Sequence, residues 1–355
     1  MINVLDKKEE KILIDYNKKR VPYLDVIRTI AILSVIIFHV IENTLNTYFL
    51  SGKAAIVYNI VAQIMYYAVP LFIMISGALF LNPKKEISIK ELYNKYIKKI
   101  VIALILFGIL YSSIEIYFNT KVISYNMITE SIKNIITGNL WAHMWYIYLI
   151  LGLYMITPLL KKFTSTCTLK EYNYILALLF VFTIALVDIK SFFNVNIAFD
   201  ILIINPYIFL FMLGDYLSRF EINKKVRALN YIISMAFVAI IIFNNIYHFM
   251  NMEITYTTFG IISIVVSIFL ICKNLIKDNI NYKIQKICAN IGKCGFGIYL
   301  IHQFFINIIF KLLKFDFILN YPFVGLLLYT LIIFILSYAI VYALRKIKFI
   351  AKYIL

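Results

Sequence analysis

Arg28 and His39 are the residues of this chain whose types and spacing are best suited to chemistry. They lie eleven residues apart in the apolar run from Tyr23 to Leu45. In an α-helix this spacing amounts to about three turns plus roughly 20°, so both side chains share one face and are separated by about 16 Å along the axis. Ionisable groups in a membrane span are costly unless they face a polar interior. The shared face is therefore a candidate active site that lines a cavity.

Glu42 lies one turn beyond His39 and is a candidate partner for its imidazole. A carboxylate in this position can fix the tautomer of a general base, so His39, Arg28 and Glu42 are the predicted catalytic residues. Two simpler interpretations stay open. His39 could be a structural histidine bonded to a neighbouring helix, and Arg28 could extend toward the cytoplasmic headgroups.

The composition predicts an all-α, polytopic membrane protein. Hydrophobic residues make up 63% of the 355 residues, charged residues only 15%, and the mean hydropathy is +0.86. Soluble domains carry about 25% charged residues. Runs of about 18 or more apolar residues are long enough to cross a bilayer as helices. Ten spans are predicted, at about 23–47, 54–82, 97–119, 141–160, 172–188, 201–218, 229–247, 255–272, 292–313 and 322–344.

The distribution of Lys and Arg predicts the topology. One set of loops and tails carries 28 of these residues and the opposite set carries 6. Because short basic loops stay cytoplasmic, both termini are expected in the cytoplasm, and the protein is expected in the cell (cytoplasmic) membrane. We expect a basic cytoplasmic tail at 1–22 that is not a signal peptide, a transmembrane domain at 23–346 and a cytoplasmic tail at 347–355. The net charge of +17 follows this alternation, so no nucleic-acid partner is expected.

The four cysteines do not predict a metal site. They fall in or beside the cytoplasmic loops, where thiols stay reduced, and their spacing matches neither a zinc site nor a redox pair: Cys167, Cys272, Cys288 and Cys294.

Other polar residues of the spans are candidates for lining the same cavity. In the ninth span, Tyr299 and His302 share a face and could line the cavity of His39, and His143 lies near the outer surface, where it could be merely interfacial. Glu115 lies deep in the third span, with no partner identifiable from the sequence. In the second span, Pro70 and the pair Ser76-Gly77 could bend the helix or let it pack closely.

With these residues, the chain resembles the acyltransferase 3 family of membrane O-acyltransferases. The family signature is an Arg followed by ten residues and a His in the first span, as in residues 24–31 followed by Phe38-His39. Further matches occur in order along the chain, at residues 69–77, 143–146, 151–152, Pro158, 209–214 and 297–302.

The resemblance implies a ten-helix enzyme that moves an acyl group, usually acetyl from acetyl-CoA, onto a hydroxyl of a cell-envelope glycan or related acceptor. It also implies that His39 is catalytic and that Arg28 takes part in the use of the donor. A basic family motif, often written with arginines, appears here as Lys95, Lys98 and Lys99, which have the charge but lack the guanidinium fork. These lysines are still expected to help dock the phosphates of the donor. No extracytoplasmic hydrolase-like domain follows the tenth span, so the stand-alone form of the family is expected. Whether a partner protein completes the transfer is left open by the sequence.

The expected reaction needs a base and a stabilised oxyanion. His39 either deprotonates the acceptor directly or carries the acyl group between two half-reactions. The alternative is a transporter or flippase of glycan intermediates, because intramembrane ionisable groups also mark transport pathways. A purely structural scaffold gives no reason for the Arg28 to His39 face.

Overall fold

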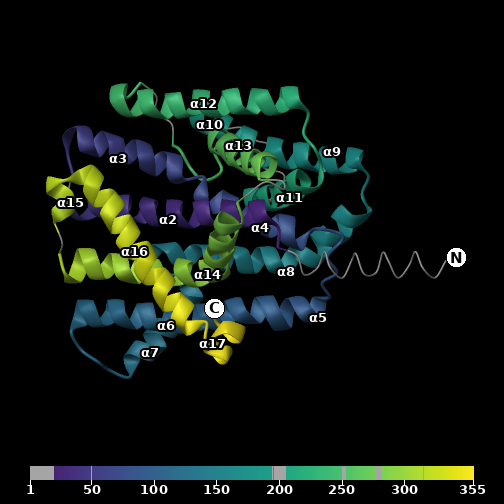
Figure 1. Cartoon of the computed structure of the whole chain (residues 1–355). Coiled ribbons are helices and arrows are strands. Elements are labelled where there is room, and N and C mark those ends of the chain that lie inside the picture. Colours follow the sequence, from purple (N-terminus) through teal and green to yellow (C-terminus); the bar gives the residue numbers. More distant parts are fainter. Residues whose placement is uncertain are drawn as a thin grey trace. The chain divides into compact units, whose positions relative to one another are not determined.

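The computed structural model describes residues 20–48, 50–193, 195, 205–249, 253–276, 281–314 and 316–355, which are helical with connecting turns (Figure 1). Residues 1–19 of the predicted tail lie outside the described part. The helices are α2 (Pro22–Tyr48), α3 (Gly52–Met65), α4 (Ala68–Phe80), α5 (Ile89–Glu91), η1 (Leu92–Ile97), α6 (Lys98–Thr120), α7 (Asn126–Thr137), η2 (Ala142–Met144), α8 (Trp145–Thr166), α9 (Leu169–Phe180), η3 (Val181–Ala185), α10 (Leu186–Phe193), α11 (Pro206–Arg219), α12 (Lys224–Tyr247), α13 (Phe259–Leu275), α14 (Tyr282–Asn307), η4 (Ile308–Leu312), α15 (Phe317–Asn320), α16 (Pro322–Leu344) and α17 (Lys348–Tyr353).

The predicted all-α membrane architecture is confirmed. Among the described residues, eight helical segments are long and apolar enough to cross a membrane. The two remaining predicted spans correspond to shorter helices, α11 with 14 residues and α13 with 17 residues. The start of the predicted span at 201–218 falls in residues 201–204, outside the described part, so its full length is not tested.

The described residues form two compact units. Unit 1 comprises those of 1–86, 159–293 and 315–330, and unit 2 comprises those of 87–158, 294–314 and 331–355. Each unit is described by itself below. Arg28, His39 and Glu42 belong to unit 1, whereas the other predicted site residues belong to unit 2.

In unit 1, α4 and α11 cross with their backbones in direct contact. A Cβ on Gly77 would lie 1.7 Å from the carbonyl oxygen of Phe211, and a Cβ on Gly214 would lie 2.1 Å from that of Met74. Small residues permit such close approach of membrane helices. The close packing predicted for Ser76-Gly77 is thus confirmed, and this crossing fixes the ends of α4 and α11 relative to each other.

The second predicted span is broken into α3 and α4, as Pro70 allowed. The amides of Tyr66 and Tyr67 donate to carbonyls three residues earlier, at 3.4 Å and 3.3 Å, and α4 begins at Ala68. Pro70 therefore occupies the first turn of α4, where a missing N–H costs little.

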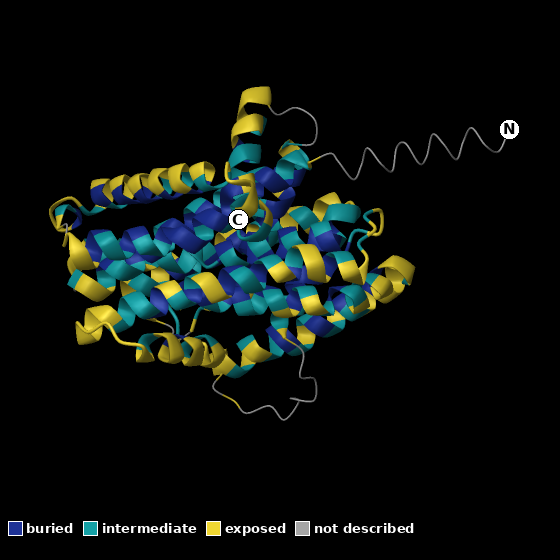
Figure 2. Ribbon diagram, turned by 90° about the horizontal axis from the view of Figure 1, so that it is seen from below, coloured by how far each residue is buried: buried dark blue, intermediate teal, exposed yellow. Residues whose placement is uncertain are grey.

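Many exposed side chains are apolar, as expected where helices face lipid. On α12, for example, Ile232 is 64% exposed and Met235 is 74% exposed. Figure 2 shows exposed and buried positions on different faces of the same helices. The buried polar groups are therefore the exceptions that identify candidate sites.

Candidate active site

His39 and Glu42 form the contact that their spacing predicted. Nδ1 of His39 lies 2.9 Å from Oε2 of Glu42, and His39 is buried in α2. When the Nδ1–H of His39 donates a hydrogen bond to the carboxylate, the lone pair of the neutral imidazole is on Nε2. The side-chain amide of Asn43 also donates to the carbonyl oxygen of His39, at 2.8 Å. The local helix thus orients a histidine as a base is oriented, although its catalytic role stays a prediction.

Arg28 is paired with a carboxylate that sequence reasoning missed. Its Nη1 lies 3.0 Å from Oδ1 of Asp25, which is buried in the first turn of α2. Arg20 donates two hydrogen bonds to the same carboxylate, from Nε at 2.9 Å and from Nη2 at 2.8 Å. The Arg28 side chain is 19% exposed. The signal available in the sequence was an aspartate three residues before the arginine.

The Arg20, Asp25 and Arg28 cluster packs against α14 at Gly292. A Cβ there would lie 2.8 Å from Oδ1 of Asp25 and 3.2 Å from a guanidinium nitrogen of each arginine. The glycine therefore leaves just enough room for the charged cluster, and a larger residue would displace it.

In unit 2, three predicted cavity residues meet. The His143 ring lies 5.6 Å from the Tyr299 ring and 5.2 Å from the His302 ring, measured between centroids. The Tyr299 hydroxyl donates to the carbonyl oxygen of His143. His143 is 2% exposed within the described structure, so its ring is packed among other side chains. That these three residues line the same cavity as His39 stays a prediction.

Glu115, the candidate for which the sequence identified no partner, has two partners in unit 2. It lies five residues before the end of α6, and its side chain is 40% exposed. Trp141 donates to it from Nε1 at 3.1 Å, and Lys311 lies 3.4 Å away. The sequence did not identify these partners because both come from distant parts of the chain, and the functional role of Glu115 stays a prediction.

The lysines expected to dock the donor already contact protein groups. Lys95 pairs with Glu91 at 3.0 Å, and Lys99 donates to the carbonyl oxygen of Ala351 at 3.4 Å. Lys98 lies 5.7 Å from the centroid of the Tyr353 ring. Their role in binding the donor stays a prediction, but a donor would compete for these contacts.

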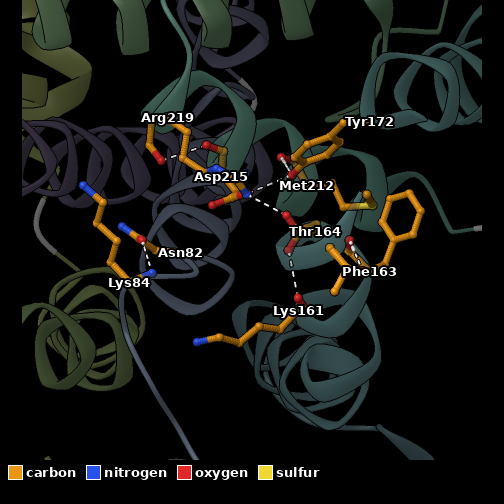
Figure 3. A network of polar contacts seen from close by, with 11 residues as sticks. Asn82, Lys84, Lys161, Phe163, Thr164, Tyr172, Met212, Asp215 and Arg219 are labelled. Carbon is orange, nitrogen blue, oxygen red and sulfur yellow. Dashed lines mark hydrogen bonds and ion pairs between the residues drawn. The ribbon is translucent and has the colours of Figure 1, made fainter. Parts of the chain in front are cut away.

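A second buried ionic group in unit 1 was not predicted. Asp215 is fully buried, and its Oδ2 accepts from the Tyr172 hydroxyl and from Arg219, both at 2.9 Å. Arg219 also donates to the carbonyl oxygen of Thr164 at 3.0 Å. Figure 3 shows these residues gathered around the end of α11. The four-residue spacing of Asp215 and Arg219 in an apolar helix was the available signal.

No cluster of three or more His, Cys, Asp or Glu that could hold a metal occurs in the described part of the chain. An oriented histidine can carry out proton transfer or nucleophilic catalysis.

The fold defines a polytopic membrane protein of helices, and the first of its spans carries an oriented histidine. A family model described as an acyltransferase domain, of the acyltransferase 3 type, matches residues 21–346. The chain therefore belongs to the acyltransferase 3 family, as its motifs predicted, and is a membrane acyltransferase. The comparisons found no similar curated protein and no similar solved structure.

Proposed function

We propose that this protein is an O-acetyltransferase of the cell (cytoplasmic) membrane that moves acetyl from acetyl-CoA to a hydroxyl of a cell-envelope glycan. The family supports acyl transfer in general. The observation that carries the catalytic assignment is the 2.9 Å contact between His39 and Glu42. The donor and the acceptor are inferred from the family resemblance and from the predicted topology.

His39 acts as the base in this proposal. Nε2 removes the proton of the acceptor hydroxyl while the oxygen attacks the thioester carbonyl, forming the new C–O bond. The C–S bond then breaks, and the protonated imidazole returns the proton to the CoA thiolate. The negative charge of Glu42 stabilises the imidazolium that forms between these steps. A variant route places the acetyl group on His39 before the acceptor takes it.

Arg28 assists the donor in this proposal. It shares a helix face with His39 at a separation of about 16 Å along the axis, so one extended donor can contact both. Asp25 holds the guanidinium of Arg28 at 3.0 Å. The arginine side chain therefore loses little further conformational entropy when the donor binds.

Purified protein supplied with radiolabelled acetyl-CoA and envelope glycan tests the function. The wild type should label the glycan, and His39→Ala should lose about 10²–10⁴ in rate. His248→Asn is the matched control, because His248 is an exposed histidine with a φ of 52° that asparagine also tolerates. Full activity in His39→Ala, or no transfer from acetyl-CoA in any form, would refute the proposal.

A further inference from the structure

Unit 1 contains a pocket that neither the family signature nor the proposed chemistry uses. It measures about 480 Å³ and lies between three chain segments: the start of α2, the end of α4 with its following turn, and the end of α11. Binding sites for small molecules typically span about 300–1,000 Å³. All three segments border stretches that the Lys and Arg distribution predicts to be cytoplasmic, where soluble acyl donors occur.

The pocket is built to attract an anion. Lys84, Lys85 and Arg219 line it, and none of its described lining residues carries a carboxylate. Asn82 and Ser218 add neutral hydrogen-bonding groups to the lining. Asn82 also shapes the turn, because its Oδ1 accepts from the backbone amide of Lys84 at 2.9 Å. Asp215 balances the charge of Arg219, so Lys84 and Lys85 supply the net positive charge while the guanidinium adds N–H donors. Such a site favours a ligand with phosphate oxygens.

Arg219 is anchored before any ligand arrives. Its Nη1 makes both the 2.9 Å contact to buried Asp215 and the 3.0 Å contact to Thr164. A guanidinium has five N–H donors in a fixed fork, so these contacts leave most of its binding capacity. The ring centroids of Phe220 and Tyr172 lie 5.0 Å and 5.7 Å from its central carbon. Figure 3 shows Arg219, Asn82 and Lys84 together with the residues that hold the arginine.

The opposite side of the basic turn is held as well. The ammonium group of Lys161 on α8 donates to the carbonyl oxygen of Lys85, which ties the turn after α4 to α8 within unit 1. The backbone of the turn that carries Lys84 and Lys85 is thus attached to α8. A fixed backbone places the two lysines beside Arg219 before a ligand binds.

Aromatic rings complete the lining. Tyr23 at the start of α2 and Phe220 at the end of α11 both border the pocket. Aromatic faces stack with nucleobases regardless of sequence. Cations combined with aromatic rings match a nucleotide better than they match a simple inorganic anion.

We propose that this pocket binds the phosphorylated adenine nucleotide end of the acyl donor, with Lys84, Lys85 and Arg219 on its phosphates. The inference rests on the proposed function, since it assigns a site to the donor named there. It also differs from the docking predicted at Lys95, Lys98 and Lys99. A phospholipid headgroup shares the phosphate chemistry, so the test must separate a soluble nucleotide from a lipid.

Adenosine 3′,5′-bisphosphate is the probe, measured by calorimetry on the full chain in nanodiscs of phosphatidylcholine alone. Lys84→Gln combined with Lys85→Gln should weaken binding by about tenfold or more, because two charge-assisted contacts are lost. The matched control is Lys224→Gln combined with Lys225→Gln, which removes two adjacent exposed lysines from the start of α12, outside the pocket. It should bind within about twofold of wild type, as surface charges contribute little.

A second part of the experiment uses a variant that changes the shape of the pocket without changing its charge. Leu79 lines the pocket, and Leu79→Trp should fill part of it and weaken binding while the net charge stays the same. Equal binding by the wild type and the Lys84 and Lys85 double variant would overturn the inference. So would an equal loss in the Lys224 and Lys225 control, since general surface charge would then explain the affinity.

The lipid arm repeats the measurement in nanodiscs that contain phosphatidylglycerol, with mass spectrometry of retained lipid. The nucleotide assignment would be wrong, and the pocket would be a headgroup site, if phosphatidylglycerol were retained only when Lys84 and Lys85 are present and the bisphosphate did not bind. Acetyl transfer from acetyl-CoA is measured in parallel. If transfer is intact while the pocket variants bind normally, only this inference fails; if transfer is absent while the bisphosphate binds, the proposed function fails instead.

Discussion

His39 and Glu42 are joined across one turn of α2 by a 2.9 Å contact between Nδ1 and Oε2. Glu42→Gln keeps the shape of the side chain but removes its negative charge. We expect kcat to fall, by less than in His39→Ala and within the range of about 10²–10⁴ for positioned acid–base catalysis, because the imidazolium loses its partner. The KM for acetyl-CoA should stay within about twofold, since Glu42 acts on the histidine and not on the donor.

The control for Glu42→Gln is the midpoint of thermal unfolding, which should match that of the wild type. A variant with normal kcat would show that Glu42 is only a neighbour of His39. A raised KM with normal kcat would instead place Glu42 on the donor path.

Arg28→Lys tests whether the guanidinium itself is needed. Lysine keeps the charge but lacks the planar fork that bonds a phosphate or carbonyl at two points. We expect kcat/KM for acetyl-CoA to fall by about tenfold or more, the effect of losing one charge-assisted hydrogen bond worth about 1.5–3 kcal/mol. Steady-state kinetics with Arg227→Lys as the matched control would measure it. Normal kinetics in Arg28→Lys would limit Arg28 to pairing with Asp25.

The crossing of α4 and α11 predicts a sharp contrast between two glycines. Gly214→Ala places a Cβ 2.1 Å from the carbonyl oxygen of Met74, so the helices must separate, at a cost of about 1–3 kcal/mol or more. Gly152→Ala on α8 has no heavy atom within 4 Å of its Cβ and should leave stability unchanged or raise it. Thermal unfolding in detergent measures both. Equal midpoints for the two variants would contradict the close crossing.

The sequence predicted the membrane helices because the bilayer sets both their length and their apolar character. It also predicted the contact between His39 and Glu42, since both residues lie on one helix and their spacing fixes their separation. The close packing at Gly77 was predictable in kind, because small residues mark helix crossings. Its partner, Phe211, was not predictable.

Contacts between distant segments could not be predicted in the same way. Nothing in the spacing of Glu115 identifies Trp141 or Lys311, and nothing in the ninth span identifies the carbonyl of His143 as the partner of Tyr299. Such pairs depend on how helices dock, which a single sequence with its separate apolar spans leaves undetermined. The basic loops 83–99 and 219–228 could be identified in the sequence as a docking surface for phosphates. That Lys84 and Arg219 border one pocket could not be predicted, because their segments are far apart in the chain.

The last prediction concerns topology, which follows from the bias of 28 Lys and Arg against 6. Burial raises the pKa of the Cys167 thiol, which slows its labelling on either side of the membrane, so introduced thiols are more informative. Lys53→Cys and Lys224→Cys place thiols at exposed positions on opposite predicted sides, in a background whose four native cysteines are replaced by serine. A membrane-impermeant maleimide added to intact cells should label the first and spare the second. Both should react after the cells are permeabilised, which controls for access. Labelling of Lys224→Cys in intact cells would reverse the orientation, and it would place the basic pocket on the side of the membrane that lacks acetyl-CoA.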